Sequence, residues 1–473
     1  MKKILAIVAA MMLLVCALAP MGMAETQFDE EVDVLVVGAG GSGMGAAIEA
    51  KTAGAEKVLV VDKQEGTLVS LTYLSEGILS GYEDQLAKKH DVHMTAEACY
   101  DQMMASRKWI NDPDLTWITA KECGNLIDWL IDEVHVPFKD ACEVNPGYGP
   151  LPLIHYIEGK GAGLREPFLA KLDELGIELR MGNRAVKLIG NEAHDQVIGA
   201  QVETADGVKN IKADAVVLCT GGYADSPEMM GRLAPGNEYM ISMRTNGPST
   251  GDGIVMASEF GALIQSTEHA IYGGGDYSNN PNTLRGVVML DATGARFKDE
   301  RGHGYLSRDS YRMAMQKNDV DYFWQVADAA SVAESESDTK AIEKNKNIIV
   351  ADTLAELAEK TGMDAKVLEE TVAAWNASCD AGVDEAFERN PETMVKLETA
   401  PYYAMKAGCR AGFTYGGIAR NDKGEVLNYR GESIPGLYVG GEAATAACGN
   451  GWTMSHAITW GRIAGRSAGA FAK

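Results

Sequence analysis

A glycine-rich turn near the N-terminus constrains the fold of this chain more than any other feature. The segment VDVLVVGAGGSGMGAAIEAKTAGAEKVLVVDK reads as an apolar strand, a glycine turn, a helix of small residues and a second apolar strand. Gly38, Gly40 and Gly43 fit the pattern G-x-G-x-x-G, which allows a tight turn, a close pyrophosphate and close helix–strand packing. Asp62 follows about 20 residues later, where an acid binds ribose hydroxyls. The segment therefore predicts a βαβ unit that binds a dinucleotide.

Later stretches of the chain predict a second sheet that leads back to this unit. After Arg180, the segments AVKLIG, VIGAQVETADG and ADAVVLCTGGYA predict short strands separated by turns. The last stretch, from Ile434, returns to a strand, a glycine-rich loop and a helix of small residues, so we place it beside the first unit. The pattern of residues 94–136 predicts helices, and the charged segment 333–392 predicts helices with a solvated face.

Length and composition indicate a globular protein of more than one domain. The chain has 473 residues, more than one hydrophobic core usually organises, so we expect two domains. Hydrophobic residues make up 46% and charged residues 23%, proportions that argue against a disordered chain or a coiled coil.

The first residues have the layout of a secretory signal peptide. Lys2 and Lys3 precede an apolar run and then small residues, and we predict cleavage after Ala24, so residues 1–24 form the signal. The apolar run is shorter than the roughly 20 residues of a membrane span, so a retained anchor is the weaker interpretation. A lipoprotein site at Cys16 is a second alternative. We therefore expect an exported protein with no stable membrane span after cleavage.

Charge and cysteine usage exclude several classes of partner and cofactor. Loss of the two signal lysines changes the net charge from −24 to −26, which argues against nucleic acid and anionic membranes as partners. A neutral or basic electron donor suits this charge, although the charge also simply keeps an exported protein in solution. The seven cysteines after the signal are scattered without CxxC or CxxCH, so we predict no attached haem, no iron–sulfur cluster and no metal site.

Several short motifs occur in an order that resembles one flavoprotein family. They are TGGYA (Thr220 to Ala224), TGDGIVMASEFGA (Thr250 to Ala262), GARFKDE (Gly294 to Glu300) with a later SRD (Ser307 to Asp309), and PGLYVGGEA (Pro435 to Ala443) with WGRIAG (Trp460 to Gly465). With the fingerprint, they make the chain similar to soluble fumarate reductases, flavocytochromes c, urocanate reductases and the flavin subunit of succinate dehydrogenase.

The resemblance implies an α/β fold with a Rossmann-like FAD-binding domain and an inserted α+β capping domain over the substrate. It places the FAD-binding domain at residues 28–263 and 404–473 and the capping domain at 264–403. The residues that it assigns to the FAD site are Gly38, Gly40, Gly43, Asp62, Lys63, Ser75, Gly77, Val186, Thr220, Gly221, Gly222, Asp252, Gly441, Glu442 and Ser455.

The resemblance also implies a set of catalytic residues. Arg308, in SRD, matches the arginine that delivers a proton to the substrate, while Arg285 matches a second arginine of that relay and His269 a histidine that touches substrate. Reduction of an electron-poor C=C bond needs a hydride at one carbon and a proton at the other. The alternatives are a salt bridge at the hinge of the cap for Arg308 and purely structural roles for the other two.

The chain departs from the family pattern at several positions. The flavin-contacting GGNT is replaced by LVSL at 68–71, and the acid that starts the proton relay aligns with Asn282. The extra residues RGHGYL precede SRD and make the placing of Arg308 less direct. The two groups that hold a fumarate carboxylate align with Phe413 and Cys448. Plain fumarate reduction is therefore not expected, because each lost charge-assisted hydrogen bond is worth roughly 1.5–3 kcal/mol.

Aromatic residues take the place of the lost carboxylate-binding groups. Phe413, Tyr415 and Trp452, together with Tyr272, suit a planar and less charged substrate such as an aryl acrylate or a ring enone. Tyr415 is also a candidate hydrogen-bond donor to the substrate. The alternative is that these residues are core residues between the two domains. His456 is a further candidate for contact with flavin or substrate, although a histidine in a glycine-rich loop before a helix is more often structural.

Three hypotheses for function remain from the sequence. The first is an exported, FAD-dependent reductase of an activated C=C bond in a small unsaturated substrate, with Arg308 as proton donor. Its electrons come from a separate exported flavin or haem protein, because the nicotinamide pool is cytoplasmic. The second is a dehydrogenase of the ketosteroid type that uses Tyr415 as base. The third is a flavin electron carrier without turnover of its own.

Overall fold

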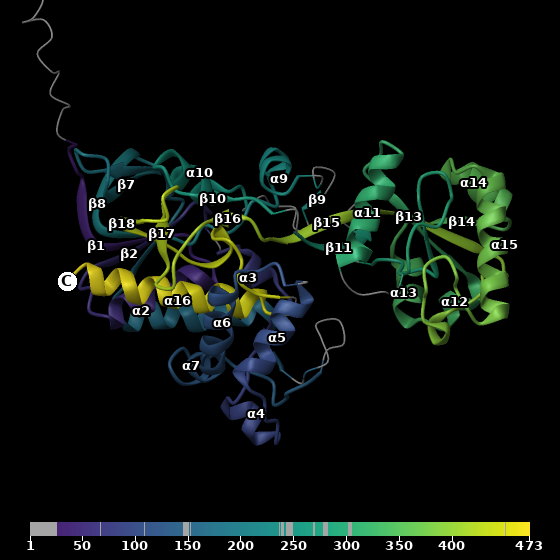
Figure 1. The fold of residues 1–473 in the computed structure, drawn as a ribbon, viewed down its shortest axis with the longest axis horizontal. Helices are drawn as coiled ribbons and strands as arrows, with labels where there is room; N and C mark the ends of the chain where they lie inside the picture. Colours follow the sequence, from purple (N-terminus) through teal and green to yellow (C-terminus); the bar gives the residue numbers. More distant parts are fainter. Residues whose placement is uncertain are drawn as a thin grey trace, which may run out of the picture.

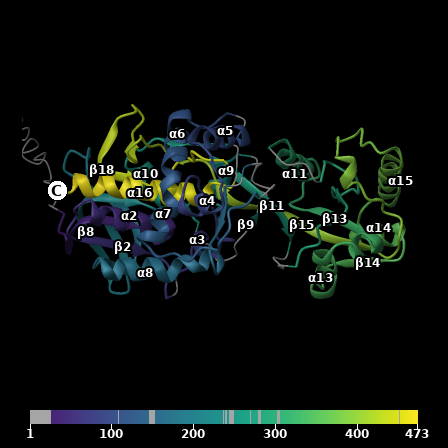
Figure 2. The ribbon, with the colours of Figure 1, turned by 90° about the horizontal axis from the view of Figure 1, so that it is seen from below.

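The chain forms two bodies that lie end to end (Figures 1 and 2). The computed structural model describes residues 26–66, 68–107, 109–144, 151, 153–235, 237, 241–242, 249–267, 270–277, 282–300, 305–449 and 451–473. In residues 241–242, 270–276, 305–309 and 409–410 the description is of the backbone alone. Both described ends of the chain lie in the larger body, which we call the large domain. The middle of the chain, green in Figure 1, forms the smaller body, which we call the cap.

A sheet of eight strands forms the middle of the large domain. Its order is β17-β18-β8-β1-β2-β5, and β7 and then β6 extend it from β8. The prediction of a second sheet after Arg180 is therefore wrong, because β8 pairs directly with β1 and carries β7 and β6 into the first sheet. Neighbours from β18 to β5 are parallel, whereas β17, β7 and β6 pair antiparallel. The parallel strands are apolar along their length because both faces of such a sheet are covered. The strands are β1 (Glu30–Val37), β2 (Val58–Asp62), β5 (Glu178–Met181), β6 (Arg184–Gly190), β7 (Val197–Thr204), β8 (Gly207–Leu218), β17 (Glu425–Leu427) and β18 (Ser433–Val439).

Two helices from opposite ends of the chain pack against each other on this sheet. They are α2 (Gly41–Thr52) and α16 (Thr453–Phe471), which run side by side in Figures 1 and 2. Gly461, Gly465 and Gly469 lie four residues apart on α16, and a Cβ at any of them would overlap a backbone oxygen of α2. Small residues at this spacing form one face of a helix, so the two backbones approach closely. The fingerprint helix is therefore fixed in place by the C-terminus.

Short elements complete the large domain. The remaining helices are α3 (Leu71–Leu74), α4 (Gln85–Lys89), α5 (Ala96–Ser106), α6 (Pro113–Glu122), α7 (Leu126–Asp132), α8 (Arg165–Glu174), α9 (Pro227–Leu233) and α10 (Asp252–Glu259). Two small sheets pair β3 (Ile78–Ser80) with β4 (Ile154–Tyr156) and β10 (Ile264–Gln265) with β16 (Gly417–Ile418). As predicted, residues 94–136 are helical in large part.

The cap is built on a sheet of six strands with helices against it. Its order is β11-β15-β13-β12, and β14 and β9 also pair with β15. The strands are β9 (Ile241–Ser242), β11 (Ala270–Asp276), β12 (Val288–Leu290), β13 (Phe323–Asp328), β14 (Ile349–Ala351) and β15 (Tyr402–Thr414). The helices are α11 (Tyr305–Lys317), α12 (Ala329–Ala333), α13 (Glu336–Lys344), α14 (Leu354–Thr361) and α15 (Ala365–Ala381).

Strand β15 connects the cap to the large domain. Its first half pairs with β13 and β14 inside the cap, and its last residues, Phe413 and Thr414, pair with the start of β11. The strand ends at Thr414. The chain then enters the large domain at Gly416 and continues into β16. Residues 413–415 therefore lie at the junction of the two bodies, as Figure 1 shows for the end of β15. The predicted boundaries of the domains remain a prediction.

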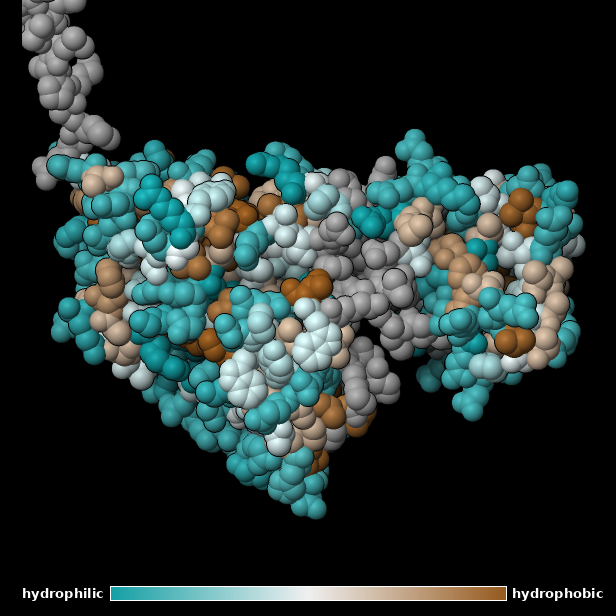
Figure 3. Space-filling view, in the orientation of Figure 1, coloured by the Kyte–Doolittle hydropathy of each residue, from teal (hydrophilic) through white to brown (hydrophobic). Residues whose placement is uncertain are grey.

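The surface is polar over most of the face seen in Figure 3. Apolar side chains appear there in small separate groups. Among the helices of the described residues, none combines the length and the apolar character that crossing a bilayer requires.

Candidate active site

The glycine turn between β1 and α2 has the shape that the fingerprint predicts. Gly38 has a φ of +105°, and a Cβ on it would overlap the backbone oxygen of Cys219 in the neighbouring strand end. A Cβ on Gly43 would overlap the backbone oxygen of Gly38. Gly40 is the N-cap of α2 and has no side chain to cap the helix. No side chain of the N-cap residue therefore covers the positive end of the α2 dipole, which is free to interact with an anionic group in front of the helix.

Asp62 holds the acidic position at the end of β2. Its Oδ2 accepts a hydrogen bond from the backbone N–H of Ala39 at 2.7 Å, and its Oδ1 accepts one from Gln64 N–H at 2.8 Å. These bonds fix the carboxylate beside the glycine turn. Each carboxylate oxygen keeps a further lone pair for a ribose hydroxyl.

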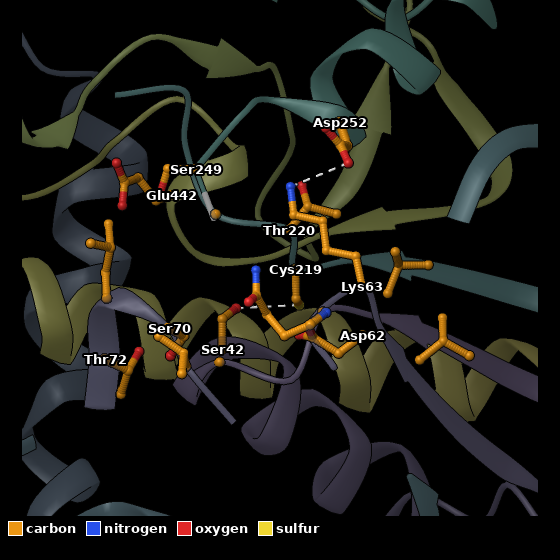
Figure 4. A pocket seen from close by; sticks show the side chains of 18 of the residues that line it. Ser42, Asp62, Lys63, Ser70, Thr72, Cys219, Thr220, Ser249, Asp252 and Glu442 are labelled. Atoms are coloured by element: carbon orange, nitrogen blue, oxygen red, sulfur yellow. Dashed lines mark hydrogen bonds and ion pairs between the residues drawn. The ribbon is translucent and has the colours of Figure 1, made fainter. Parts of the chain in front are cut away.

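The turn and the end of β2 border a cavity with about 840 Å³ of space, part of it open to solvent. Of the predicted FAD-site residues, those lining it are Gly38, Gly40, Asp62, Lys63, Thr220, Gly221, Asp252 and Glu442. Figure 4 shows Glu442 and Asp252 on opposite sides of it. The wall also contains residues that sequence reasoning missed, among them Ser42, Ser70, Thr72, Arg184, Cys219 and Ser249.

One side of the cavity carries a compact ionic group. Asp252 is 3.3 Å from Lys63 Nζ and 3.0 Å from Arg184 Nε, and its Oδ1 accepts a hydrogen bond from Thr250 Oγ1 at 2.6 Å. Burial raises the pKa of Asp252, but the bonds from Arg184 and Thr250 and the charge of Lys63 outweigh burial, so the pKa lies below its ordinary value. This carboxylate is therefore ionised at neutral pH.

The opposite side carries Glu442, whose pKa is shifted in the other direction from that of Asp252. Glu442 Oε1 accepts hydrogen bonds from the backbone N–H and the hydroxyl of Thr414, at 2.7 and 2.9 Å. Burial raises the pKa of Glu442 to about 7, against the effect of these bonds and with a contribution from the charge of Asp225. A Cβ on Gly222 would overlap both Glu442 Oε1 and Thr414 Oγ1, so only glycine fits there.

The segment that replaces the family's GGNT also faces the cavity. Thr72 Oγ1 accepts a hydrogen bond from the backbone N–H of Gly41, the first residue of α2, at 3.1 Å. Ser70 Oγ is buried and has no hydrogen-bond partner within the described part of the chain. A buried hydroxyl in a cavity wall requires a partner, which a polar ligand in that cavity would supply. The glycine turn, the carboxylate of Asp62, the ionic group around Asp252 and the buried hydroxyl of Ser70 together fit a bound dinucleotide.

Comparison with known proteins identifies the ligand class. The sequence profile of a family described as "FAD binding domain" matches residues 33–455. The chain belongs to this family.

Individual relatives agree with this assignment. Fumarate reductase (cytochrome) of Shewanella frigidimarina is 29% identical over 466 residues, which cover 94% of this chain and 78% of that protein. Vinyl phenol reductase of Lactiplantibacillus plantarum is 27% identical over 485 residues, which cover 93% of this chain and 96% of that protein. The solved open conformation of a flavocytochrome c3 fumarate reductase is similar with a TM-score of 0.79 at 28% identity, covering 94% of this chain and 79% of that one.

These matches confirm several predictions from the sequence. The fold class is α/β, with a Rossmann-like FAD-binding domain. The cofactor is FAD, and the chain is a FAD-dependent oxidoreductase of the fumarate-reductase type.

Other predicted FAD-site residues lie behind the cavity wall. Gly43, Gly222 and Gly441 stand where neighbouring atoms leave no room for a side chain. A Cβ on Gly441, for example, would lie 2.8 Å from Ser42 Cβ. Val186 stands where the pairing of β6 with β7 is irregular, between Ala185 and Lys187. Their roles toward FAD remain predictions.

The predicted serines, Ser455 near the start of α16 and Ser75 at the end of α3, make bonds within the protein. Ser455 Oγ accepts from Ser80 N–H at 2.9 Å and donates to Ser80 O at 2.8 Å. Ser75 Oγ donates to Thr72 O at 2.7 Å and accepts from Gly77 N–H at 3.2 Å. The bonds of both hydroxyls hold the loop beside the flavin cavity in place. Contact of these two residues with FAD, through their backbone atoms, remains a prediction.

Within the part of the chain that it describes, the structure does not bring the predicted catalytic side chains together. Arg308 lies on α11 of the cap, but its side chain is outside the description, and His269 lies outside the described residues. The side chain of Arg285 is exposed, while its backbone N–H donates to Asp338 at 2.8 Å. Tyr415 is buried in the large domain. The four residues therefore remain predictions as a catalytic group.

The predicted aromatic residues do gather, at the junction of the two bodies. Phe413 and Tyr415 meet edge to face, with ring centroids 5.1 Å apart, and Trp452 packs in the same buried group. We call this group the aromatic cluster; its other buried members are Cys99, Met103, Ala120, Cys123, Leu153, Ala446 and Cys448. The side chain of Tyr272 lies outside the description. Because residues alternate along β15, Thr414 faces Glu442 while its two neighbours face the cluster.

Proposed function

We propose that the protein reduces an activated C=C bond next to an aromatic or ring group. The observation that carries this proposal is the aromatic cluster, which adjoins Thr414 and so the Glu442 side of the flavin cavity. Rings of this kind bind a planar substrate by apolar contact and stacking. Fumarate is a small dicarboxylate and makes no use of such a surface.

The relatives support a C=C reductase with an aryl substrate. Vinyl phenol reductase, whose substrate carries an aromatic ring, is matched along 96% of its length, so this chain has about the same extent as that enzyme. The fumarate reductase of Shewanella frigidimarina is longer, with 78% of its length covered.

The chemistry divides between cofactor and protein. Bound FAD supplies the hydride that the reduction needs. Gly38, Gly40 and the open N-terminus of α2 bind its phosphates, and Asp62 binds its ribose. Arg308, on the first turns of α11, delivers the proton to the second carbon, and His269 and Arg285 orient substrate and renew that proton. An arginine serves as acid only when it is held against the substrate and reprotonated by neighbours, because its ordinary pKa is above 12.

The cellular setting follows from the sequence. We propose that residues 1–24 direct export and that the electron donor is a separate exported flavin or haem protein. The whole chain has a net charge of −24, and loss of the two signal lysines makes it −26. This charge suits a neutral or basic donor and repels nucleic acid and anionic membranes.

One observation favours a second candidate, a dehydrogenase in which Tyr415 removes a proton from a saturated substrate. The Tyr415 ring is 1% exposed and lies 3.4 Å from the guanidinium carbon of Arg107, a cation that would stabilise negative charge nearby. The two candidates differ in whether substrate oxidises the reduced flavin or reduces the oxidised one.

A steady-state assay with reduced viologen tests the proposal. The mature holoprotein is given fumarate, urocanate, aryl acrylates, vinyl phenols and cyclic enones, and products are identified by mass spectrometry as gaining two hydrogens. We expect an aryl or ring member to be reduced, and Arg308→Ala to lower kcat by at least about 100-fold. Lys317→Ala, an exposed cation on the same helix, is the matched control. Reduction of fumarate alone would contradict the proposal.

A further inference from the structure

Arg107 places a buried cation against the aromatic cluster. It follows α5 as its C-cap residue and is 2% exposed. Its guanidinium carbon lies 3.4 Å from the centre of the Tyr415 ring, and its Nε donates to Asn111 Oδ1 at 3.2 Å. Asn111 Nδ2 in turn donates to the backbone oxygen of Cys448 at 3.0 Å. Arg107 is thus tied to the loop that follows Glu442 and to the ring at the end of β15.

A second buried cation reaches the same loop from another direction. Arg420 is 4% exposed and lies with its guanidinium carbon 3.8 Å from the ring centre of Trp460. Its Nη2 is 3.1 Å from His456 Nε2, which also accepts from Ala447 N–H at 3.2 Å. Within the described residues, Arg420 Nε and Nη1 and His456 Nδ1 have no hydrogen-bond partner.

The charge state of this pair is clear from its surroundings. Burial lowers the pKa of Arg420 to about 9, so the group is still a cation at neutral pH. Burial and the charge of Arg420 keep the pKa of His456 well below its ordinary value, so the imidazole is neutral. A buried guanidinium with unused N–H groups is stabilised by an anion, and its planar fork matches a carboxylate.

Both cations act at Cys448, a member of the aromatic cluster. Burial raises the pKa of the Cys448 thiol, and the charges of Arg107 and Arg420 both oppose that rise, so both lie within electrostatic range of it. The cluster also contains Phe413 and Tyr415, which stand on either side of the Thr414 that binds Glu442. A site here would therefore combine an apolar wall with positive charge, next to the flavin cavity.

We propose that Arg107, together with Arg420, binds the carboxylate of an aryl-acrylate substrate whose ring packs on Phe413 and Tyr415. The inference rests on the proposed function and narrows it, since it selects a monocarboxylate with an aromatic ring over a neutral enone and over a dicarboxylate. A cation at the carboxylate also stabilises the negative charge that develops as the conjugated C=C bond accepts a hydride. Arg107 is thus a specificity-determining residue.

The test compares two ligands of similar shape, of which only one is charged. Cinnamate and benzalacetone share a ring and a C=C bond, and benzalacetone has a methyl ketone in place of the carboxylate. Because Arg107 and Tyr415 are almost fully buried, contact with a ligand requires neighbouring side chains to shift, so binding is measured directly. The oxidised mature holoprotein is titrated with each ligand, and the flavin absorbance reports Kd.

Three variants accompany the wild type. Arg107→Gln removes the charge, Arg107→Lys keeps it without the planar fork, and Arg430→Gln, an exposed arginine, is the matched control. We expect Arg107→Gln to weaken cinnamate binding roughly 10- to 100-fold and benzalacetone binding less than about 3-fold. Arg107→Lys should lie between wild type and Arg107→Gln, and Arg430→Gln should match wild type.

The outcomes separate this inference from the proposed function. Equal losses for the two ligands, or equal binding of both by wild type, would overturn the inference. If cinnamate binding depends on Arg107 but the reduced protein reduces no aryl acceptor, the proposed function fails and the anion site stands. If both ligands are reduced alike without regard to Arg107, the proposed function stands and the anion site fails. Should Arg107→Gln lose FAD, Arg420→Gln gives the same comparison, with selective loss for cinnamate in support and equal binding against.

Discussion

Replacing Glu442 with glutamine separates charge from hydrogen bonding in the flavin cavity. Glutamine Oε1 still accepts the two bonds from Thr414, but the side chain no longer ionises. In the FAD-free protein, burial raises the pKa of Glu442 from its ordinary 4.5 to about 7. Between these values the unfolded chain has lost the proton and the folded protein has not, so stability falls as pH rises. The contribution is fully present below pH 4.5 and is lost as pH passes through about 7.

The size of this effect follows from the two pKa values. The difference between 4.5 and about 7, at about 1.4 kcal/mol per pH unit, corresponds to about 3 kcal/mol. At about 2 cal/mol/K per residue, this is a change in Tm of about 3 °C for a chain of this length. Differential scanning fluorimetry of FAD-free wild type and Glu442→Gln from pH 4.5 to 9 should give curves that diverge by this amount, with the variant more stable at high pH. Parallel curves would refute the assigned charge state.

Further predictions concern FAD retention and catalysis. Gly43→Ala should abolish FAD retention, because its Cβ would overlap a backbone oxygen, whereas Gly431→Ala, in an open surface turn, should retain FAD; flavin absorbance per protein after gel filtration checks both. Asp62→Ala should weaken FAD binding at least about 10-fold in reconstitution titrations, because two backbone N–H groups lose their acceptor. Arg308→Ala should stop reduction of the acceptor while Tyr415→Phe lowers kcat less than about 10-fold; the reverse order in single-turnover rates would favour the dehydrogenase.

The flavin half of the fold could be predicted because its signals are local. Gly38, Gly40, Gly43 and Asp62 lie within one short segment, and their spacing together with the apolar runs around them predicts a strand, a turn and a helix. Gly461 and Gly465 of α16 belong to the motif WGRIAG, and their four-residue spacing suits close packing against α2. Such motifs can be recognised in a sequence because contacts with the neighbouring backbone allow only a small residue at each glycine position.

The substrate side could not be predicted in the same way. Arg107 meets Tyr415 across about 300 residues of sequence, and no short pattern links the two. The segment at 68–71 departs from the family motif, yet Ser70 and the following Thr72 still line the flavin cavity. The family pattern located the missing carboxylate-binding groups, but only the folded chain shows which residues from other elements come near Cys448.

The most direct test of the central claim is the reoxidation of the bound flavin under anaerobic single-turnover conditions. The holoprotein is reduced with one equivalent of dithionite and mixed in a stopped-flow instrument with cinnamate, vinyl phenol, a cyclic enone or fumarate, and the flavin absorbance is followed. The account predicts rapid reoxidation by an aryl acceptor, slow or no reoxidation by fumarate, and loss of the fast phase in Arg308→Ala. A flavin that stays reduced with every aryl and ring acceptor, or that fumarate alone reoxidises, would contradict it.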